Sequence, residues 1–184
     1  MPLTQVASGL IESGAALANI GTGNITPAYL SQPLTRDTAK ASTSGTFIDF
    51  TGIPSWVRRI TVMYNGVSTN GASAYMIQLG DSGGIETTGY NSVAQTSNVA
   101  TTSTSGLLTM YSTQAAGLNN GVIILANVSG NIWVTSGITG YNSGPGTSSF
   151  AGSKETSATL DRIRITTVNG TDTFDAGSIN ILYE

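Results

Sequence analysis

Apolar and polar residues alternate with a period of two along much of the chain after residue 45. The segments RITVMY (59–64) and RIRITT (162–167) place their isoleucines on one side and their arginines on the other. This alternation is typical of antiparallel strands that bury one face. We therefore interpret the adjacent Arg58 and Arg59 as part of an outer sheet face rather than as a binding site.

Six further segments are rich in β-branched and apolar residues and are predicted to be strands. They are 47–50, 75–80, 106–112, 121–128, 131–137 and 178–184. Turn sequences such as NG, SGG, NNG and NSGPG lie between the strands, as expected of hairpins. The pattern predicts about eight to ten short strands, and hence an all-β, jelly-roll-like antiparallel β-sandwich over residues 45–184.

The segment GVIILANVSGNIWVTSG (121–137) is the clearest local unit, with two apolar stretches joined by a Ser-Gly turn. Its first stretch contains the uninterrupted apolar run 122–125. Such a run indicates a strand that is covered on both faces. The cover can be the centre of the sandwich or a second subunit.

Residues 1–44 differ in pattern and are predicted to form an extended N-terminal arm. They contain three of the five prolines and repeated glycines, which allow a short helix only near residues 3–18. We expect the arm to pack on another protein chain. The apolar residues expected to attach it are Leu3, Val6, Leu10, Ile11, Leu17 and Ile20.

The composition argues against catalysis. The chain has no histidine and no cysteine, which removes the commonest general base and metal ligand and every thiol nucleophile. Only 9% of the residues are charged, and the net charge of −3 comes with no basic cluster larger than a pair. We expect no enzyme activity, no cofactor or metal, and no nucleic-acid partner. Membrane insertion is not expected either, since no run approaches the ~20 apolar residues that cross a bilayer.

Three long blocks resemble the β-sandwich domain of tailed-bacteriophage tail fibres and other virion appendages. They are STSGTFIDFTGIPSWVRRITVMYNGVSTNG, NGVIILANVSGNIWVTSG and SATLDRIRITTVNGTDTFDAGSINILYE, and together they span residues 42–184. The first residues, MPLTQVASGLIESGAALANIGTGNIT, also resemble the start of such proteins.

The resemblance implies a non-enzymatic structural protein of the virion, located on the tail or capsid surface. It implies a homotrimer in which the N-terminal arm binds other virion proteins and the sandwich projects outward. Our leading hypothesis adds that the sandwich contacts host surface polysaccharide. An alternative is a capsid head-fibre or decoration protein, or a tail adaptor, with no receptor-binding role. A polysaccharide-cleaving enzyme is a third hypothesis, disfavoured by the absence of histidine and the scarcity of acids.

Two pairs of carboxylates are the remaining candidates for catalysis, because glycosidases use two acids about 5 to 10 Å apart. Asp81 and Glu86 bracket DSGGIE, and Asp172 and Asp175 lie in TDTFDAG. Both pairs fall in turn-like segments, where aspartate stabilises the local backbone. We therefore expect them to be structural, with no catalytic residue in the chain.

Two Tyr-Asn pairs in polar connections are the candidates for glycan binding. They are Tyr90 with Asn91 and Tyr141 with Asn142. An exposed tyrosine ring can stack on a sugar while the neighbouring amide binds its hydroxyl groups. In the alternative interpretation, each ring folds back over the edge of the sandwich or packs between subunits.

Overall fold

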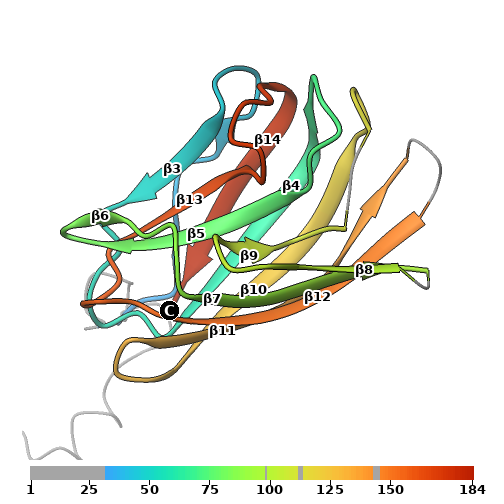
Figure 1. Cartoon of the computed structure of the whole chain (residues 1–184). Helices are drawn as coiled ribbons and strands as arrows, with labels where there is room; N and C mark the ends of the chain where they lie inside the picture. The colour runs from blue at the N-terminus through green and yellow to red at the C-terminus, as the bar shows by residue number, and fades with distance from the viewer. Residues whose placement is uncertain (1–31, 98, 112–113, 143–145) are drawn as a thin grey trace, which may run out of the picture. The chain divides into compact units, whose positions relative to one another are not determined.

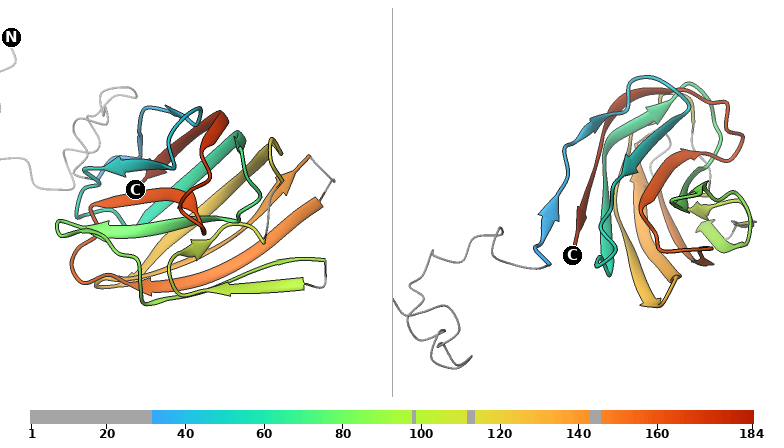
Figure 2. Two further views of the ribbon diagram at one scale, coloured as in Figure 1. Left: turned by 45° about the horizontal axis from the view of Figure 1, so that its top comes forward. Right: turned by 90° about the vertical axis from the view of Figure 1, so that its left-hand side faces the viewer.

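Two antiparallel sheets packed face to face form the β-sandwich, and both layers can be followed in Figures 1 and 2. The structure is a computed structural model that describes residues 32–97, 99–111, 114–142 and 146–184. We call the nine-stranded sheet sheet A and the five-stranded sheet sheet B. The predicted all-β antiparallel sandwich is thereby confirmed, whereas the jelly-roll-like connectivity stays a prediction.

Sheet A has the strand order β1-β14-β4-β10-β11-β12-β7-β8, with β2 also paired to β14. Its strands are β1 (Thr35–Arg36), β2 (Lys40–Ala41), β4 (Arg59–Thr69), β7 (Tyr90–Thr96), β8 (Val99–Ser103), β10 (Asn119–Ser129), β11 (Ile132–Tyr141), β12 (Gly146–Glu155) and β14 (Phe174–Tyr183). Sheet B has the order β3-β13-β5-β6, with β9 also paired to β5. Its strands are β3 (Phe47–Thr51), β5 (Tyr75–Asp81), β6 (Gly84–Ile85), β9 (Leu107–Leu108) and β13 (Arg162–Thr167).

The core lies between the sheets and is filled from alternate positions of their strands. Ile60 and Val62 of β4 point inward and are fully buried, as are Ile163 and Ile165 of β13. Burying each such side chain stabilises the fold by about 1.5–3 kcal/mol. Arg59 of β4 and Arg164 of β13 alternate with these residues and lie on the outer faces, so the predicted alternation of both segments is confirmed.

Strands β10 and β11 form the predicted hairpin at 121–137. Ile123 and Leu125 are fully buried in the core, whereas Val122 and Ile124 face outward and are exposed. Within the described part of the chain, β10 is therefore covered on one face only. Cover of its second face by another subunit stays a prediction.

Three strands of sheet A lie in segments that carry no strong strand pattern. These are β7, β8 and β12, which read YNSVAQT, VATTS and GTSSFAGSKE. They are strands because each has a neighbour to pair with: β11 pairs with β12, β12 with β7, and β7 with β8. Conversely, the strand expected at 106–112 is reduced to β9. The described chain has more strands than the eight to ten expected.

The sandwich begins earlier than residue 45. Thr35 and Arg36 pair with the last strand, β14, and so do Lys40 and Ala41. Residues 35–41 therefore belong to sheet A, although we placed them in the arm. The short helix expected near residues 3–18 lies outside the described residues.

Candidate binding groove

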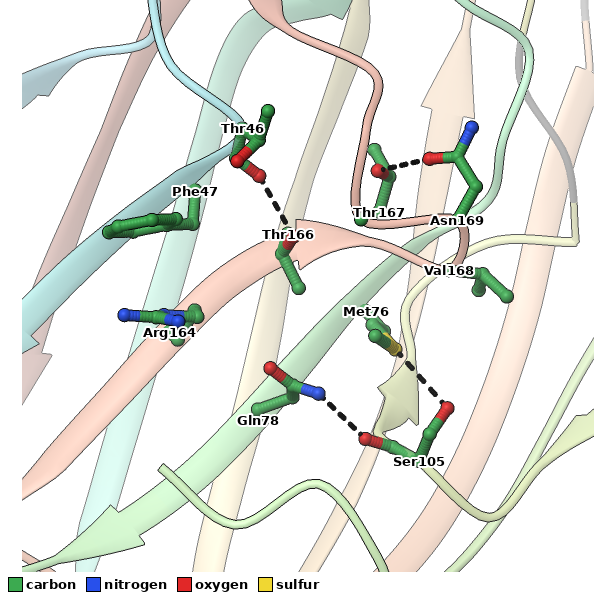
Figure 3. A pocket seen from close by; sticks show the side chains of 11 residues that line it. Thr46, Phe47, Met76, Gln78, Ser105, Arg164, Thr166, Thr167, Val168 and Asn169 are labelled. Atoms are coloured by element: carbon green, nitrogen blue, oxygen red, sulfur yellow. Dashed lines mark hydrogen bonds between the residues drawn. The ribbon is translucent and has the colours of Figure 1, made fainter. Parts of the chain in front are cut away.

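A shallow hollow of about 430 Å³ opens on the outer face of sheet B (Figure 3). Its floor is formed by β3, β13 and β5, which lie side by side in that order. The strand register places Thr166 between Phe47 of β3 and Met76 of β5. Two residues earlier on β13, Arg164 lies opposite Gln78 of β5. We call this hollow the sheet B groove.

Arg164 is held in one position by its neighbours on β3. Its Nε and Nη2 atoms donate hydrogen bonds of 2.7 and 2.8 Å to the two carboxylate oxygens of Asp49. This bidentate bond raises the pKa of Arg164, so the guanidinium stays charged. Its central carbon lies 3.7 Å from the centre of the Phe47 ring. That ring is still 47% exposed, which makes it a fixed aromatic surface at the edge of the groove.

Polar side chains of the groove retain unused hydrogen-bonding capacity. The Gln78 amide donates from Nε2 to the Ser105 carbonyl oxygen at 2.9 Å, which leaves its own carbonyl oxygen as an acceptor. The Thr166 hydroxyl donates to the Thr46 carbonyl oxygen at 2.8 Å, and its oxygen can still accept. Asp49 occupies two of the five N–H groups of Arg164, and the other three can donate to a ligand.

These features favour a neutral, hydroxylated ligand such as a sugar. A sugar presents apolar C–H faces that stack on an aromatic ring and hydroxyl groups that both donate and accept hydrogen bonds. The volume is within the range of about 300–1,000 Å³ that is usual for small-ligand sites. Because Asp49 neutralises Arg164, a strongly charged ligand is not required.

Tyr90 does not present an exposed ring, so the expectation of a stacking platform at this position is wrong. It starts β7 and points into the core, where it is 3% exposed. Its hydroxyl accepts a hydrogen bond of 2.7 Å from the Leu79 amide and donates one of 2.8 Å to the Glu86 carbonyl oxygen. Burial raises the pKa of this hydroxyl. Tyr90 is a structural residue that links the two sheets.

The other predicted glycan-binding residues do not form one site with Tyr90. Asn91 is exposed on the outer face of sheet A, where it lies opposite Ser153. Tyr141 is half-buried at the end of β11, and its hydroxyl lies 3.5 Å from Thr96 Oγ1. The side-chain oxygen of Asn142 accepts a hydrogen bond from the Leu118 amide at 3.0 Å. These contacts support the alternative interpretation for this pair, in which Tyr141 folds against the edge of the sandwich and Asn142 stabilises a loop.

The first carboxylate pair stabilises a turn and a loop. Asp81 accepts hydrogen bonds from the Gly83 amide and the Ser157 hydroxyl at 2.7 and 2.6 Å. These bonds, the hydroxyl first, hold the pKa of Asp81 below its ordinary value. Burial tends to raise the pKa of Glu86, but hydrogen bonds from Lys154 and Ser157 outweigh it and lower the pKa. Both lowered pKa values favour the charged form, and the hydrogen bonds support the local backbone; that this pair has no catalytic role stays a prediction.

The second carboxylate pair also supports the backbone. Asp172 accepts a hydrogen bond of 3.0 Å from the Ser73 amide and one of 2.6 Å from the Asn169 side chain. Asp175 accepts a hydrogen bond from the Ser68 hydroxyl. Among the described residues there is no cluster of three or more acidic, histidine or cysteine side chains that could hold a metal ion.

Of the two adjacent arginines, which we expected to belong to an outer sheet face, only Arg59 does so. Arg59 is exposed on the outer face of sheet A and forms an ion pair with Glu184. Arg58 precedes β4 and donates to the carbonyl oxygens of Ser55 and Val57, each at 3.0 Å. It lines a second, smaller hollow of about 220 Å³ together with Trp133.

The predicted attachment residues of the arm lie outside the described residues. They are Leu3, Val6, Leu10, Ile11, Leu17 and Ile20. In the part of the chain that is described, no helix is long and apolar enough to span a bilayer.

The sheet B groove was not predicted from the sequence. Phe47 and Arg164 are 117 positions apart in the chain and meet only because β3 pairs with β13. Comparisons with protein-family models, curated proteins and solved structures found no match for this chain. Its function is therefore inferred from the residues and from the geometry described above.

Proposed function

We propose that the chain is a structural subunit of a tailed-bacteriophage virion, a tail fibre or similar appendage that contacts host surface polysaccharide. In this proposal three copies assemble into a homotrimer of jelly-roll-like domains on the tail or capsid surface. The N-terminal arm binds other virion proteins. Support comes from the three long blocks that resemble such appendages and from the low charge of a chain without histidine or cysteine.

The sheet B groove carries the receptor-binding part of the proposal. It combines an exposed aromatic ring with a fixed guanidinium, an amide and hydroxyl groups. These are the groups that recognise a sugar ring. They do not favour acid catalysis, because none of the residues that line the groove is an acid and the neighbouring Asp49 is engaged in the bidentate bond with Arg164. The groove therefore fits a binding protein rather than a glycosidase.

Assembly into a trimer makes a shallow site useful. A groove of this kind binds a single sugar weakly, because it encloses little of the ligand. Three copies that engage a repetitive polysaccharide together gain apparent affinity from their effective concentration, by a factor of about 10² or more. The proposal therefore predicts weak binding to monosaccharides and tight binding to bacterial cells.

The test is the binding of the fluorescently labelled full-length protein to candidate host cells. Phe47→Ala removes the aromatic surface, and Thr51→Ala is the matched control, on an exposed residue of the same strand outside the groove. We expect saturable binding that falls by tenfold or more in Phe47→Ala and stays unchanged in Thr51→Ala, an effect of about 1.4 kcal/mol. Soluble polysaccharide extracted from the host envelope should compete.

Two outcomes would change the proposal. Equal binding by both variants would exclude the groove as the receptor site. No binding by the folded wild-type protein to any host cell would exclude the receptor-binding role and favour the capsid-decoration or tail-adaptor alternative. In that case, incorporation into particles would be the activity to measure.

A further inference from the structure

The outer face of sheet A exposes an unusual number of large apolar side chains on two neighbouring strands, β10 and β11. Val122 is 54% exposed and Ile138 is 62% exposed. The exposed apolar residues of these two strands are Val122, Ile124, Val128, Ile132, Val134 and Ile138. Single apolar residues on a surface are ordinary, but a contiguous patch of them marks an interaction site.

The strand register makes these residues contiguous. Val122 lies directly opposite Ile138 of β11 on one side and opposite Met63 of β4 on the other. Ala126 lies opposite Val134 in the same way. The apolar side chains therefore form cross-strand rows across β4, β10 and β11, whose strands run side by side in Figure 1.

The central rows continue onto β12 and β7 with small or uncharged side chains. The row through Ile124 passes Ser136 and Ala151 and reaches Val93 of β7. At the end of β12, Ile132 lies opposite the exposed Glu155, which marks the border of the neutral area. Strands β7, β8, β10 and β11 contain no charged residue. Arg59, at the β4 edge of the face, is paired with Glu184. A partner for the centre of this face must therefore be uncharged and apolar.

Other copies of this chain meet that requirement, because each presents the same neutral face, and in a trimer three such faces meet around the three-fold axis. Three rows about 6.8 Å apart across five strands about 4.8 Å apart cover about 500 Å² of projected area. This is more than half of the ~800 Å² that each partner contributes to a standard stable interface.

We propose that the outer face of sheet A, centred on Val122, Ile124 and Ile138, is the contact surface between copies of this chain. The inference rests on the proposed function, since it assigns the interface of the homotrimer. The sheet B groove lies on the opposite side of the sandwich, on the other sheet. Assembly through sheet A therefore leaves each groove open to solvent.

The first test measures the mass of the full-length protein by size-exclusion chromatography with light scattering over a series of concentrations. The double variant Val122→Thr/Ile138→Thr keeps both residues β-branched and removes apolar surface at the centre of the face. We expect a trimer for the wild type and a dissociation constant raised about a hundredfold for the double variant. Val168→Thr is the control, because Val168 is exposed at the rim of the sheet B groove.

The second test does not depend on a change of apolar residues. The chain has no cysteine, so Ser136→Cys introduces a single thiol at the centre of the face, opposite Ile124. We expect this thiol to react with a maleimide at least tenfold more slowly than the thiol of Thr51→Cys on the outer face of sheet B. Both variants should keep the wild-type circular dichroism spectrum.

The outcomes separate this inference from the proposed function. The inference would be overturned if the double variant were still a trimer and the thiol of Ser136→Cys reacted rapidly. The proposal of a homotrimer would not be affected by that result. A wild-type monomer with a reactive thiol would overturn both. A monomer with a protected thiol would show that something other than a second copy covers the face, such as residues 1–31, and would also overturn the inference.

Discussion

Replacing Tyr90 by phenylalanine removes one buried oxygen atom and leaves the ring in place. That oxygen joins the two sheets, because Tyr90 belongs to β7 of sheet A and Leu79 to β5 of sheet B. It accepts a hydrogen bond of 2.7 Å from the Leu79 amide and lies 2.8 Å from the Glu86 carbonyl oxygen, to which it donates. The substitution therefore leaves one buried donor and one acceptor without this partner.

The size of the effect follows from the burial of these two groups. Leu79 is fully buried, so its amide cannot reach water, and such an unsatisfied group costs about 1–3 kcal/mol. Glu86 is half-buried, and water can replace part of its lost bond. We expect Tyr90→Phe to lower the free energy of unfolding by about 2–3 kcal/mol. For a domain of this size, the melting temperature should fall by about 5–10 °C.

The measurement is urea unfolding followed by fluorescence, with all proteins at one concentration because assembly makes stability depend on concentration. Tyr141→Phe is the control, since within the described residues its hydroxyl makes only a long contact of 3.5 Å, with Thr96 Oγ1. The control should lose less than about 0.5 kcal/mol. A Tyr90→Phe variant as stable as the control would refute the argument that this hydroxyl links the sheets.

Two further predictions concern the stability of the fold at low pH and the backbone conformation at Gly177. Asp81 and Glu86 have lowered pKa values in the folded chain, so their stabilisation is present at neutral pH and is lost as the pH falls below about 4. The urea concentration at the midpoint of unfolding should therefore drop between pH 7 and pH 3. The drop should be smaller in the double variant Asp81→Asn/Glu86→Gln. Gly177 has a φ of +89°, and a Cβ there would lie 2.3 Å from the Gly66 carbonyl oxygen. Gly177→Ala should therefore lower the free energy of unfolding by at least about 2 kcal/mol more than Gly130→Ala. Gly130 also has a positive φ, but a Cβ there would meet no atom within 4 Å.

Local sequence patterns predict those parts of the fold that bury one face of a strand. The strand that contains Ile163 and Ile165 is recognisable because a period of two needs no information from the rest of the chain. The hairpin of β10 and β11 is recognisable for the same reason, together with its Ser-Gly turn. The all-β class follows from many such segments separated by turn sequences.

Strands defined by their neighbours are harder to predict. The segments of β7, β8 and β12 are rich in serine, threonine, glycine and alanine, and their propensity alone favours a loop. The backbone hydrogen bonds of a neighbouring strand decide their conformation. For this reason the prediction for Tyr90 was wrong. We placed it in a loop, where its ring would face water, but it is the first residue of β7 and points into the core.

The sheet B groove depends on pairing between distant segments, which one sequence does not reveal. Asp49 and Arg164 are each unremarkable members of an alternating strand, and they become a rigid pair only when β3 and β13 are neighbours. The apolar run at 122–125 did carry a usable signal. It indicated cover on both faces, and the structure accounts for one of them.

Charged side chains are distributed differently over the two outer faces of the sandwich. Sheet B places Asp49, Arg162 and Arg164 on its outer face, where ion pairs and water satisfy them. Sheet A leaves isoleucine and valine exposed on β10 and β11, where lysine or glutamate would fit equally well and would oppose association of sheet faces. The chain has few charges, and it keeps them on the outer face of sheet B and off the centre of the outer face of sheet A. In the proposed function, sheet B faces solvent and ligand and sheet A faces protein, and we therefore expect receptor binding and assembly to use separate surfaces.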